Sequence, residues 1–470
     1  MDFLFSFELY ILLFFISLFI YLGISNNKNK SLTDYFSAGK NTRWYIAMFS
    51  IVATETSVLT FISVPGIAYR GNWYFLQLSL GYIVGRILVS KFLLPLYFSN
   101  DITSIYELIG IRYNRGLQRL ASILFLSTRV LADGVRFLAT AVIIQLLTGW
   151  SLEVSVLLIG GITLLYTISG GLKAILLIDS IQFLIYFFGG VIVILFIIFS
   201  ESFIGIESLI EKGKFDILKY STNSFISDPW FIVNAFIGGI FLSFASHGVD
   251  YMMVQRALSC QSLKSAQKAM IGSGFFVLLQ FMVFLFAGSL IWQHMSGVEL
   301  TKDREFSTFI INYLPAGIKS IILVGVLSAA MSTLSSSINS LASSTVIDIF
   351  KGKVSLKNSR WISLFWAFIL IMIAIIFDET DTAIVIVGLK IASFTYGGLL
   401  GIFLISQIND KINSIDIVIG LMNSILVVFY LLFLTNVAWT FYILISLVIF
   451  IITSHLSYYF NLFIKRINHE

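Results

Sequence analysis

Apolar runs of about 20 residues alternate with short polar connections along nearly the whole chain, a length that lets an α-helix cross a bilayer. The pattern predicts an all-α polytopic membrane protein with about thirteen transmembrane helices. The predicted spans cover residues 7–24, 44–68, 73–98, 117–148, 152–168, 174–200, 230–254, 269–293, 317–345, 361–377, 383–406, 414–434 and 437–463.

Composition agrees with this pattern and excludes a soluble protein. Hydrophobic residues make up 58% of the 470 residues, charged residues only 12%, and the mean hydropathy is +0.94. We expect one membrane domain over residues 1–470. The first run lacks a basic segment before it and a small-residue cleavage site after it, which favours a retained span over a signal peptide. The single Cys260 excludes a disulfide within the chain.

The charges between the runs predict the orientation. Lys and Arg are concentrated after odd-numbered spans, whereas the connection DETDT at residues 378–382 is purely acidic. Among these basic positions are Lys28, Lys30, Lys40, Arg43, Lys173, Lys351, Lys353, Lys357 and Arg360. We therefore expect a multi-pass protein of the cell (inner or plasma) membrane, with the N-terminus outside and the C-terminus, including Lys465, in the cytoplasm. The net charge of +5 then needs no nucleic-acid partner. The hydrophilic segment 201–228 is predicted to be extracellular and to carry a short surface helix.

Two buried polar features point to chemistry. Ser332, Ser335, Ser336 and Asn339 are spaced to share one face of an apolar helix, and Asp179 lies in another apolar run. Polar oxygens at membrane depth are costly unless they bind something, and hard cations prefer oxygen ligands. The pattern predicts a sodium site and ion-driven transport. Two alternatives are close helix packing through small residues and proton coupling at a carboxylate.

The second span, IVATETSVLTFISVPGIAYRGNW, mixes hydroxyl residues with Glu55 and Pro65. Hydroxyl and β-branched residues weaken a helix and proline removes a backbone donor. We predict a broken helix at the bilayer midplane, whose freed carbonyls can bind an ion. The alternative is a kinked helix whose hydroxyls bond to carbonyls of the preceding turn. Arg86 of the third span can pair with Glu55, reach the interface or line a pathway.

Several longer motifs lie in order along the chain: ATETSVLTFISVPGIAY, YTISGGLKAILLIDSIQ, HGVDYMMVQRALSCQSLKSAQKA, LVGVLSAAMSTLSSSINSLASSTVIDIF and FTYGGLLGIFLI. Through them the chain resembles the sodium:solute symporter family, which has the LeuT-type 5+5 inverted-repeat fold, and in motif it is nearest to the sialic acid and sugar branch. The resemblance implies inverted halves at residues 44–200 and 230–406, with peripheral helices at 7–24 and 414–463.

The same resemblance implies two sets of ion ligands. A sodium site shared across the fold would use the carbonyls of Ala53, Thr56 and Ala329 and the hydroxyls of Ser332 and Thr333. A second site, as in the sialic acid branch, would use Asp179, Ser332, Ser335 and Ser336. One or two Na⁺ would then be bound per cycle.

For the solute, the resemblance points to Ser57 and Thr60, with Gln77 as a hydrogen-bonding neighbour. In the fourth span Asp133 and Arg136 can pair, which would leave Arg129 to bind a substrate carboxylate. The carboxylate-binding arginine of the sialic acid branch aligns nearer Ala132, so a structural role for Arg129 and Arg136 is the alternative.

The leading hypothesis is a monomeric sodium-coupled symporter, not an enzyme, that imports a small polar solute by alternating access. Candidate solutes are a sugar acid such as sialic acid, a monocarboxylate or a sugar. A receptor or sensor without coupled flux and a proton-coupled transporter are the alternatives. A membrane-embedded enzyme is disfavoured because the four histidines do not cluster, and a channel because no pore motif repeats.

Overall fold

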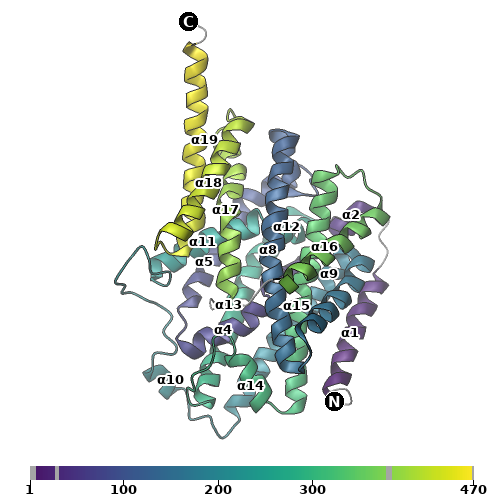
Figure 1. Ribbon diagram of the computed structural model, residues 1–470, viewed down its shortest axis with the longest axis vertical. Coiled ribbons are helices and arrows are strands. Elements are labelled where there is room, and N and C mark those ends of the chain that lie inside the picture. Colours follow the sequence, from purple (N-terminus) through teal and green to yellow (C-terminus); the bar gives the residue numbers. More distant parts are fainter. Residues whose placement is uncertain (1–6, 27–30, 377–383, 468–470) are drawn as a thin grey trace.

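In the computed structural model, which describes residues 7–26, 31–376 and 384–467, long helices run roughly parallel to the long axis of the molecule (Figure 1). The N-terminal half contains α1 (Phe7–Ser25), α3 (Trp44–Glu55), α4 (Val58–Arg70), α5 (Phe75–Leu88), α8 (Arg115–Thr148) and α9 (Leu152–Ile198). The C-terminal half contains α11 (Ile232–Gly248), α12 (Tyr251–Leu258), α13 (Leu263–His294), α15 (Ala316–Ser344), α16 (Leu356–Ile376), α17 (Ile384–Ile408), α18 (Ser414–Leu434) and α19 (Tyr442–Ile467). The prediction of an all-helical protein is confirmed for the described residues.

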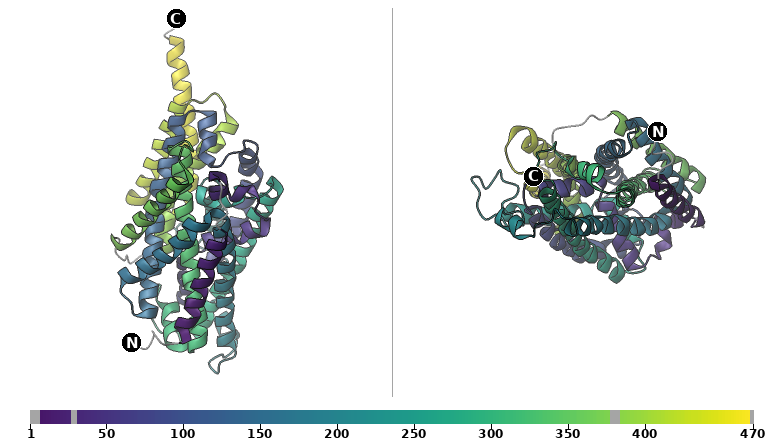
Figure 2. Two further views of the ribbon diagram at one scale, coloured as in Figure 1. Left: turned by 90° about the vertical axis from the view of Figure 1, so that its right-hand side faces the viewer. Right: turned by 90° about the horizontal axis from the view of Figure 1, so that it is seen from below.

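Short helices connect the long ones: α2 (Leu32–Ser37), α6 (Leu94–Phe98), α7 (Ile105–Arg112), α10 (Glu207–Glu211) and α14 (Glu305–Tyr313). The predicted surface helix in segment 201–228 is confirmed as α10. The two ends of the chain lie at opposite ends of the molecule (Figures 1 and 2). The acidic connection 378–382 and basic positions 28 and 30, used above to predict the orientation, lie outside the described residues.

Seven helices of the described chain are long and apolar enough to cross a membrane, or up to nine if each bent pair is one span. The predicted number of thirteen therefore stays a prediction. One feature accounts for part of the difference. The predicted spans 152–168 and 174–200 form one helical run, α9, which is kinked at Gly171 (φ 62°).

The second span is broken, as predicted, but not at the proline. Helix α3 ends at Glu55, and after Thr56 and Ser57 the chain turns by 62° into α4. Pro65 lies inside α4, where its carbonyl sits against Gly288 so closely that a side chain at 288 would clash. A second break of 64° separates α11 from α12, and Asp250 caps α12 by accepting a bond from the Met252 amide at 3.0 Å.

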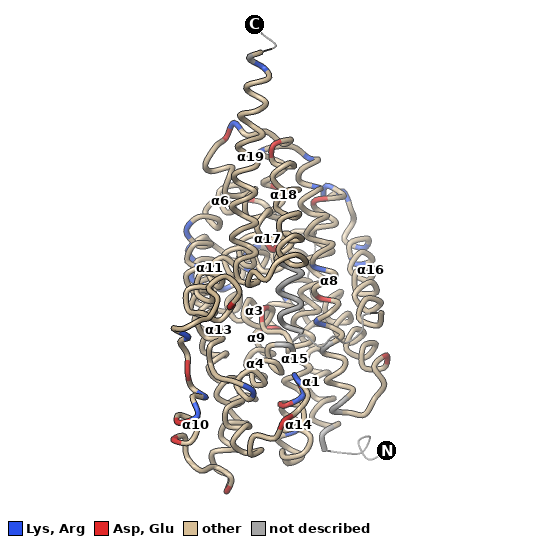
Figure 3. The backbone as a smooth tube through the Cα atoms, turned by 60° about the vertical axis from the view of Figure 1, so that its left-hand side comes forward, with Lys and Arg blue, Asp and Glu red and all other residues tan. Residues whose placement is uncertain are grey.

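Close helix packing surrounds these breaks. Helix α5 lies along α11, and α15 lies along α9. A Cβ on Gly239 would come within 2.1 Å of the Leu78 carbonyl oxygen, so only glycine permits this approach of α11 to α5. Charged residues gather toward the two ends of the molecule, with a few at mid-height beside α3 and α8 (Figure 3).

Candidate functional site

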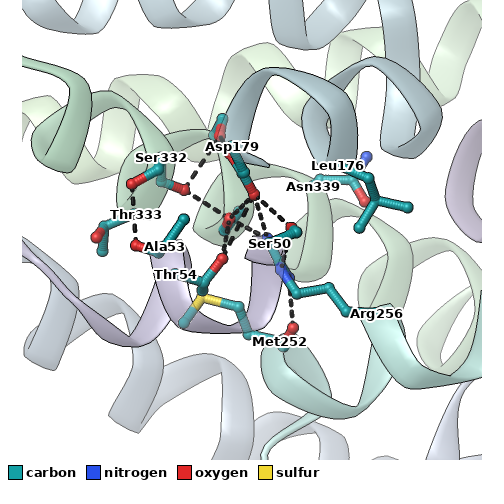
Figure 4. A network of polar contacts seen from close by, with 12 residues as sticks. Ser50, Ala53, Thr54, Leu176, Asp179, Met252, Arg256, Ser332, Thr333 and Asn339 are labelled. Carbon is teal, nitrogen blue, oxygen red and sulfur yellow. Dashed lines mark hydrogen bonds and ion pairs between the residues drawn. The ribbon is translucent and has the colours of Figure 1, made fainter. Parts of the chain in front are cut away.

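The break after α3 meets the hydroxyl face of α15, where Ala53 lies beside Ser332 and Thr333 (Figure 4). Because α3 stops at Glu55, the Ala53 carbonyl has no amide four residues on within the helix. The Ser332 hydroxyl lies 3.0 Å from that oxygen and 3.1 Å from the Ala329 carbonyl oxygen. The Thr333 hydroxyl lies 3.2 Å from the Ala329 carbonyl oxygen. Four of the five predicted cage residues thus form one cluster of neutral oxygens.

The fifth predicted cage residue, Thr56, lies at the break itself, next to Ser57. Its hydroxyl donates to the Gln280 side-chain oxygen of α13 at 2.9 Å, which anchors the unwound segment. All five cage residues are buried. Carbonyl and hydroxyl oxygens are suitable ligands for a hard monovalent cation, so the donor set fits Na⁺.

Asp179 lies on α9 beside this cluster and is fully buried. One of its oxygens accepts a bond from Ser50 at 2.7 Å, and the hydroxyls of Ser335 and Ser336 each lie 3.5 Å from the carboxylate. The predicted association of Asp179 with the serine face is therefore present. Ser332 contacts the Ala53 carbonyl instead of this carboxylate.

Arg256 of α12 is the partner that the sequence reasoning missed. Its guanidinium forms an ion pair with Asp179 at 3.3 Å and also contacts Ser50 at 3.0 Å and Ser336. The guanidinium thus supplies positive charge where a second sodium ion was expected. An arginine in the otherwise uncharged stretch YMMVQRALS was a usable signal, because a buried charge requires a partner.

A small cavity of about 70 Å³ lies next to the break. Ser57, Thr60, Arg129 and Arg136 all line it, so four of the five predicted solute residues are brought together. The fifth, Gln77, is not among the lining residues. Its amide donates to the Trp230 carbonyl at 2.8 Å, and its oxygen accepts from the Lys219 amide at 3.1 Å. Gln77 therefore fastens segment 201–228 to α5.

The prediction that Arg129 is left free is wrong. Arg129 forms an ion pair with Asp133 one turn away and another with Asp250 at 2.7 Å. The reason is tertiary, because the break between α11 and α12 brings a second carboxylate to α8. Arg136 lies 3.5 Å from Asp133 and is more exposed, with 16% of its side chain accessible against 4% for Arg129. Arg136 is therefore held less tightly by carboxylates than Arg129.

Glu55 also lines the cavity and forms an ion pair with Arg86. Of the three roles suggested for Arg86, the pairing with Glu55 is therefore confirmed. The imidazole Nε2 of His247, in α11, lies 3.5 Å from the same carboxylate oxygen. The aromatic rings of Phe75, Tyr82 and Phe281 form the apolar part of the wall.

Two broken helices packed around a buried oxygen cluster and a cavity define a carrier of the LeuT-type fold. Among solved structures, the substrate-bound outward-open state of a Na⁺-coupled sialic acid symporter has a TM-score of 0.86 to this chain at 22% sequence identity, covering 96% of this chain and 97% of that one. At that identity the likeness establishes the fold.

The chain belongs to the sodium:solute symporter family, whose pattern it matches over residues 35–423. The human sodium-coupled monocarboxylate transporter 2 is 27% identical over 383 residues, covering 75% of this chain and 59% of the relative. The sodium/sialic acid symporter NanT of Aliivibrio fischeri is 24% identical over 468 residues, covering 94% and 92%. The family and these relatives are transporters and not enzymes, and the chain is a multi-pass membrane protein.

Proposed function

We propose that this protein is a sodium-coupled symporter that imports a small polar organic solute by alternating access. It acts as a monomer in the cell membrane, with its N-terminus outside and its C-terminus in the cytoplasm. The single observation that carries the proposal is the Ser332 hydroxyl 3.0 Å from the Ala53 carbonyl, because it joins the break of α3 to the polar face of α15.

Sodium in the cage formed by Ala53, Thr56, Ala329, Ser332 and Thr333 would link the unwound segment to α15. Such a link stabilises the conformation in which the solute cavity opens outward, because the ion binds only where both parts of the cage are present. Binding of the solute then permits closure and reopening to the cytoplasm. Loss of Na⁺ on that side releases the solute.

The rocking units are the two inverted halves, residues 44–200 and 230–406. This assignment is supported by the two breaks, of 62° and 64°, which fall in the first helical unit of each half. We also propose that one Na⁺ accompanies each solute. Arg256 already places a positive charge 3.3 Å from Asp179, and a sodium ion there would meet its repulsion.

The test is solute uptake into proteoliposomes under an inward Na⁺ gradient, with an equal K⁺ gradient and an inward proton gradient as comparisons. Solutes are first found by a thermal-shift screen with and without Na⁺, since a bound solute stabilises by mass action. We expect uptake with Na⁺ alone. Uptake driven by the proton gradient would refute sodium coupling, and thermal stabilisation by a solute without any uptake would indicate a sensor.

A further inference from the structure

The chemical class of the solute can be inferred from the two ends of the cavity, and this inference rests on the proposed function. At one end of the cavity lie Glu55, the last residue of α3, and His247, the residue before the last of α11. The C-termini of two helices, with their unpaired carbonyl groups, therefore meet at this end. Helix C-termini carry partial negative charge, to which the Glu55 carboxylate adds its own. This end favours a cationic group.

Two atoms at this end have bonding capacity left for a ligand. The Glu55 side chain is 16% exposed, and its contacts to Arg86 and His247 both involve the same oxygen. Within the described residues the Nε2 of His247 makes no hydrogen bond of good geometry, and its contact with the Glu55 carboxylate is 3.5 Å long, although only 1% of this histidine is exposed. A buried nitrogen held only by such a long contact keeps bonding capacity, so its position in the cavity wall points to a bound polar group.

The other end is positive. Arg136 lines the cavity, and among the described residues its one side-chain partner is Asp133 at 3.5 Å. Ser57 lies beside it, at the N-terminal end of α4, where unpaired backbone amides favour an anion. Guanidinium and helix N-terminus together suit a carboxylate.

The charged groups of the wall and their ion-pair partners together have no net charge. Glu55, Arg129 and Arg136 line the cavity, and their partners Arg86, Asp133 and Asp250 lie behind it, so three arginines are matched by three carboxylates. A monoanion would leave one uncompensated charge in a desolvated space, which is unfavourable. A solute with one positive and one negative group preserves the balance and matches each end.

The cavity is also small. At about 70 Å³ it has room for roughly five water-sized groups. The apolar wall formed by Phe75, Leu242, Met253 and Phe281 borders it. We propose that the solute is a small zwitterion of the amino acid class, with its ammonium at Glu55 and His247 and its carboxylate at Arg136.

The first test compares isosteric solutes in proteoliposomes of the full chain under a Na⁺ gradient. L-Alanine is compared with L-lactate, which has a hydroxyl in place of the ammonium, and with L-alaninamide, which has no carboxylate. Glycine, serine and proline are added, with glycolate as the hydroxy-acid partner of glycine. We expect at least one amino acid to be taken up roughly tenfold or more faster than its matched analogue, since a site built for a polar group rejects analogues that lack it.

The second test uses charge-removing variants. Glu55→Gln should lower the ratio of amino acid to hydroxy acid uptake, because it removes the partner of the ammonium. Arg136→Gln should reduce uptake of both solutes and leave that ratio unchanged, since both carry the carboxylate. If Glu55→Gln fails to fold because Arg86 loses its partner, the wild-type ratio and Arg136→Gln still test the proposal. An unchanged ratio in folded Glu55→Gln would overturn it.

The outcomes separate this inference from the proposed function. Sodium-driven uptake of lactate or sialic acid, without uptake of any zwitterion in the panel, would overturn the zwitterion assignment and leave sodium symport standing. Absence of sodium-driven uptake for every solute, in protein that is folded and reconstituted, would overturn both.

Discussion

The Ser332 hydroxyl offers the most direct test of the sodium cage. In Ser332→Ala the cage loses one oxygen while the helix keeps a good helix-forming residue. A bond between a neutral group and a charged one contributes about 1.5–3 kcal/mol, and about 1.4 kcal/mol corresponds to a tenfold change in affinity. We therefore expect the Na⁺ concentration for half-maximal uptake to rise roughly ten- to hundredfold.

The measurement is a Na⁺ titration of solute uptake in proteoliposomes, supported by a Na⁺ titration of thermal stability in detergent. Ser340→Ala is the matched control. Ser340 is buried on the same helix, and within the described part of the chain its hydroxyl bonds only to the Ser337 carbonyl of that helix, at 3.1 Å. The control should titrate like the wild type. Equal half-saturation values for Ser332→Ala and Ser340→Ala would refute the assignment of Ser332 as a sodium ligand.

Three further outcomes follow from the buried contacts. Asp179→Asn leaves Arg256 without its ion-pair partner and should lower the free energy of unfolding of the protein by about 3–5 kcal/mol. In a thermal-unfolding cycle, the double variant with Arg256→Gln should recover part of that loss. If the double variant recovers none of it, the ion pair is contradicted. Arg129→Gln should lower the melting temperature far more than Arg136→Gln, because it removes the ion-pair partner of Asp250 and the closer of the two partners of Asp133. Equal shifts would contradict the structural role of Arg129. Gln77→Ala should lower thermal stability without changing the apparent affinity for solute, and a raised half-saturation for solute would instead place Gln77 in the binding site.

The broken second span illustrates what could be predicted locally and what could not. Hydroxyl residues and Glu55 predicted a break, but Pro65 was expected to contribute to it and lies inside α4 instead. Pro65 is the eighth of the thirteen residues of α4 and removes one backbone donor without ending the helix, whereas the segment from Glu55 to Ser57 offers side chains that compete for backbone groups. The position of the break thus depended on which groups found partners elsewhere, such as Gln280 for Thr56.

The amino-acid sequence alone predicts the helical class, the hydroxyl face of residues 332–339 and the presence of charges at membrane depth, because hydrophobic runs and helical spacing are local properties. The partners of those charges depend on how the helices pack against one another. Arg129 is held by Asp250 from 121 residues away, and Arg256 reaches Asp179 across 77 residues. Spacing along one helix cannot reveal such pairs, because a buried charge takes whichever opposite charge the packing of other helices brings to it.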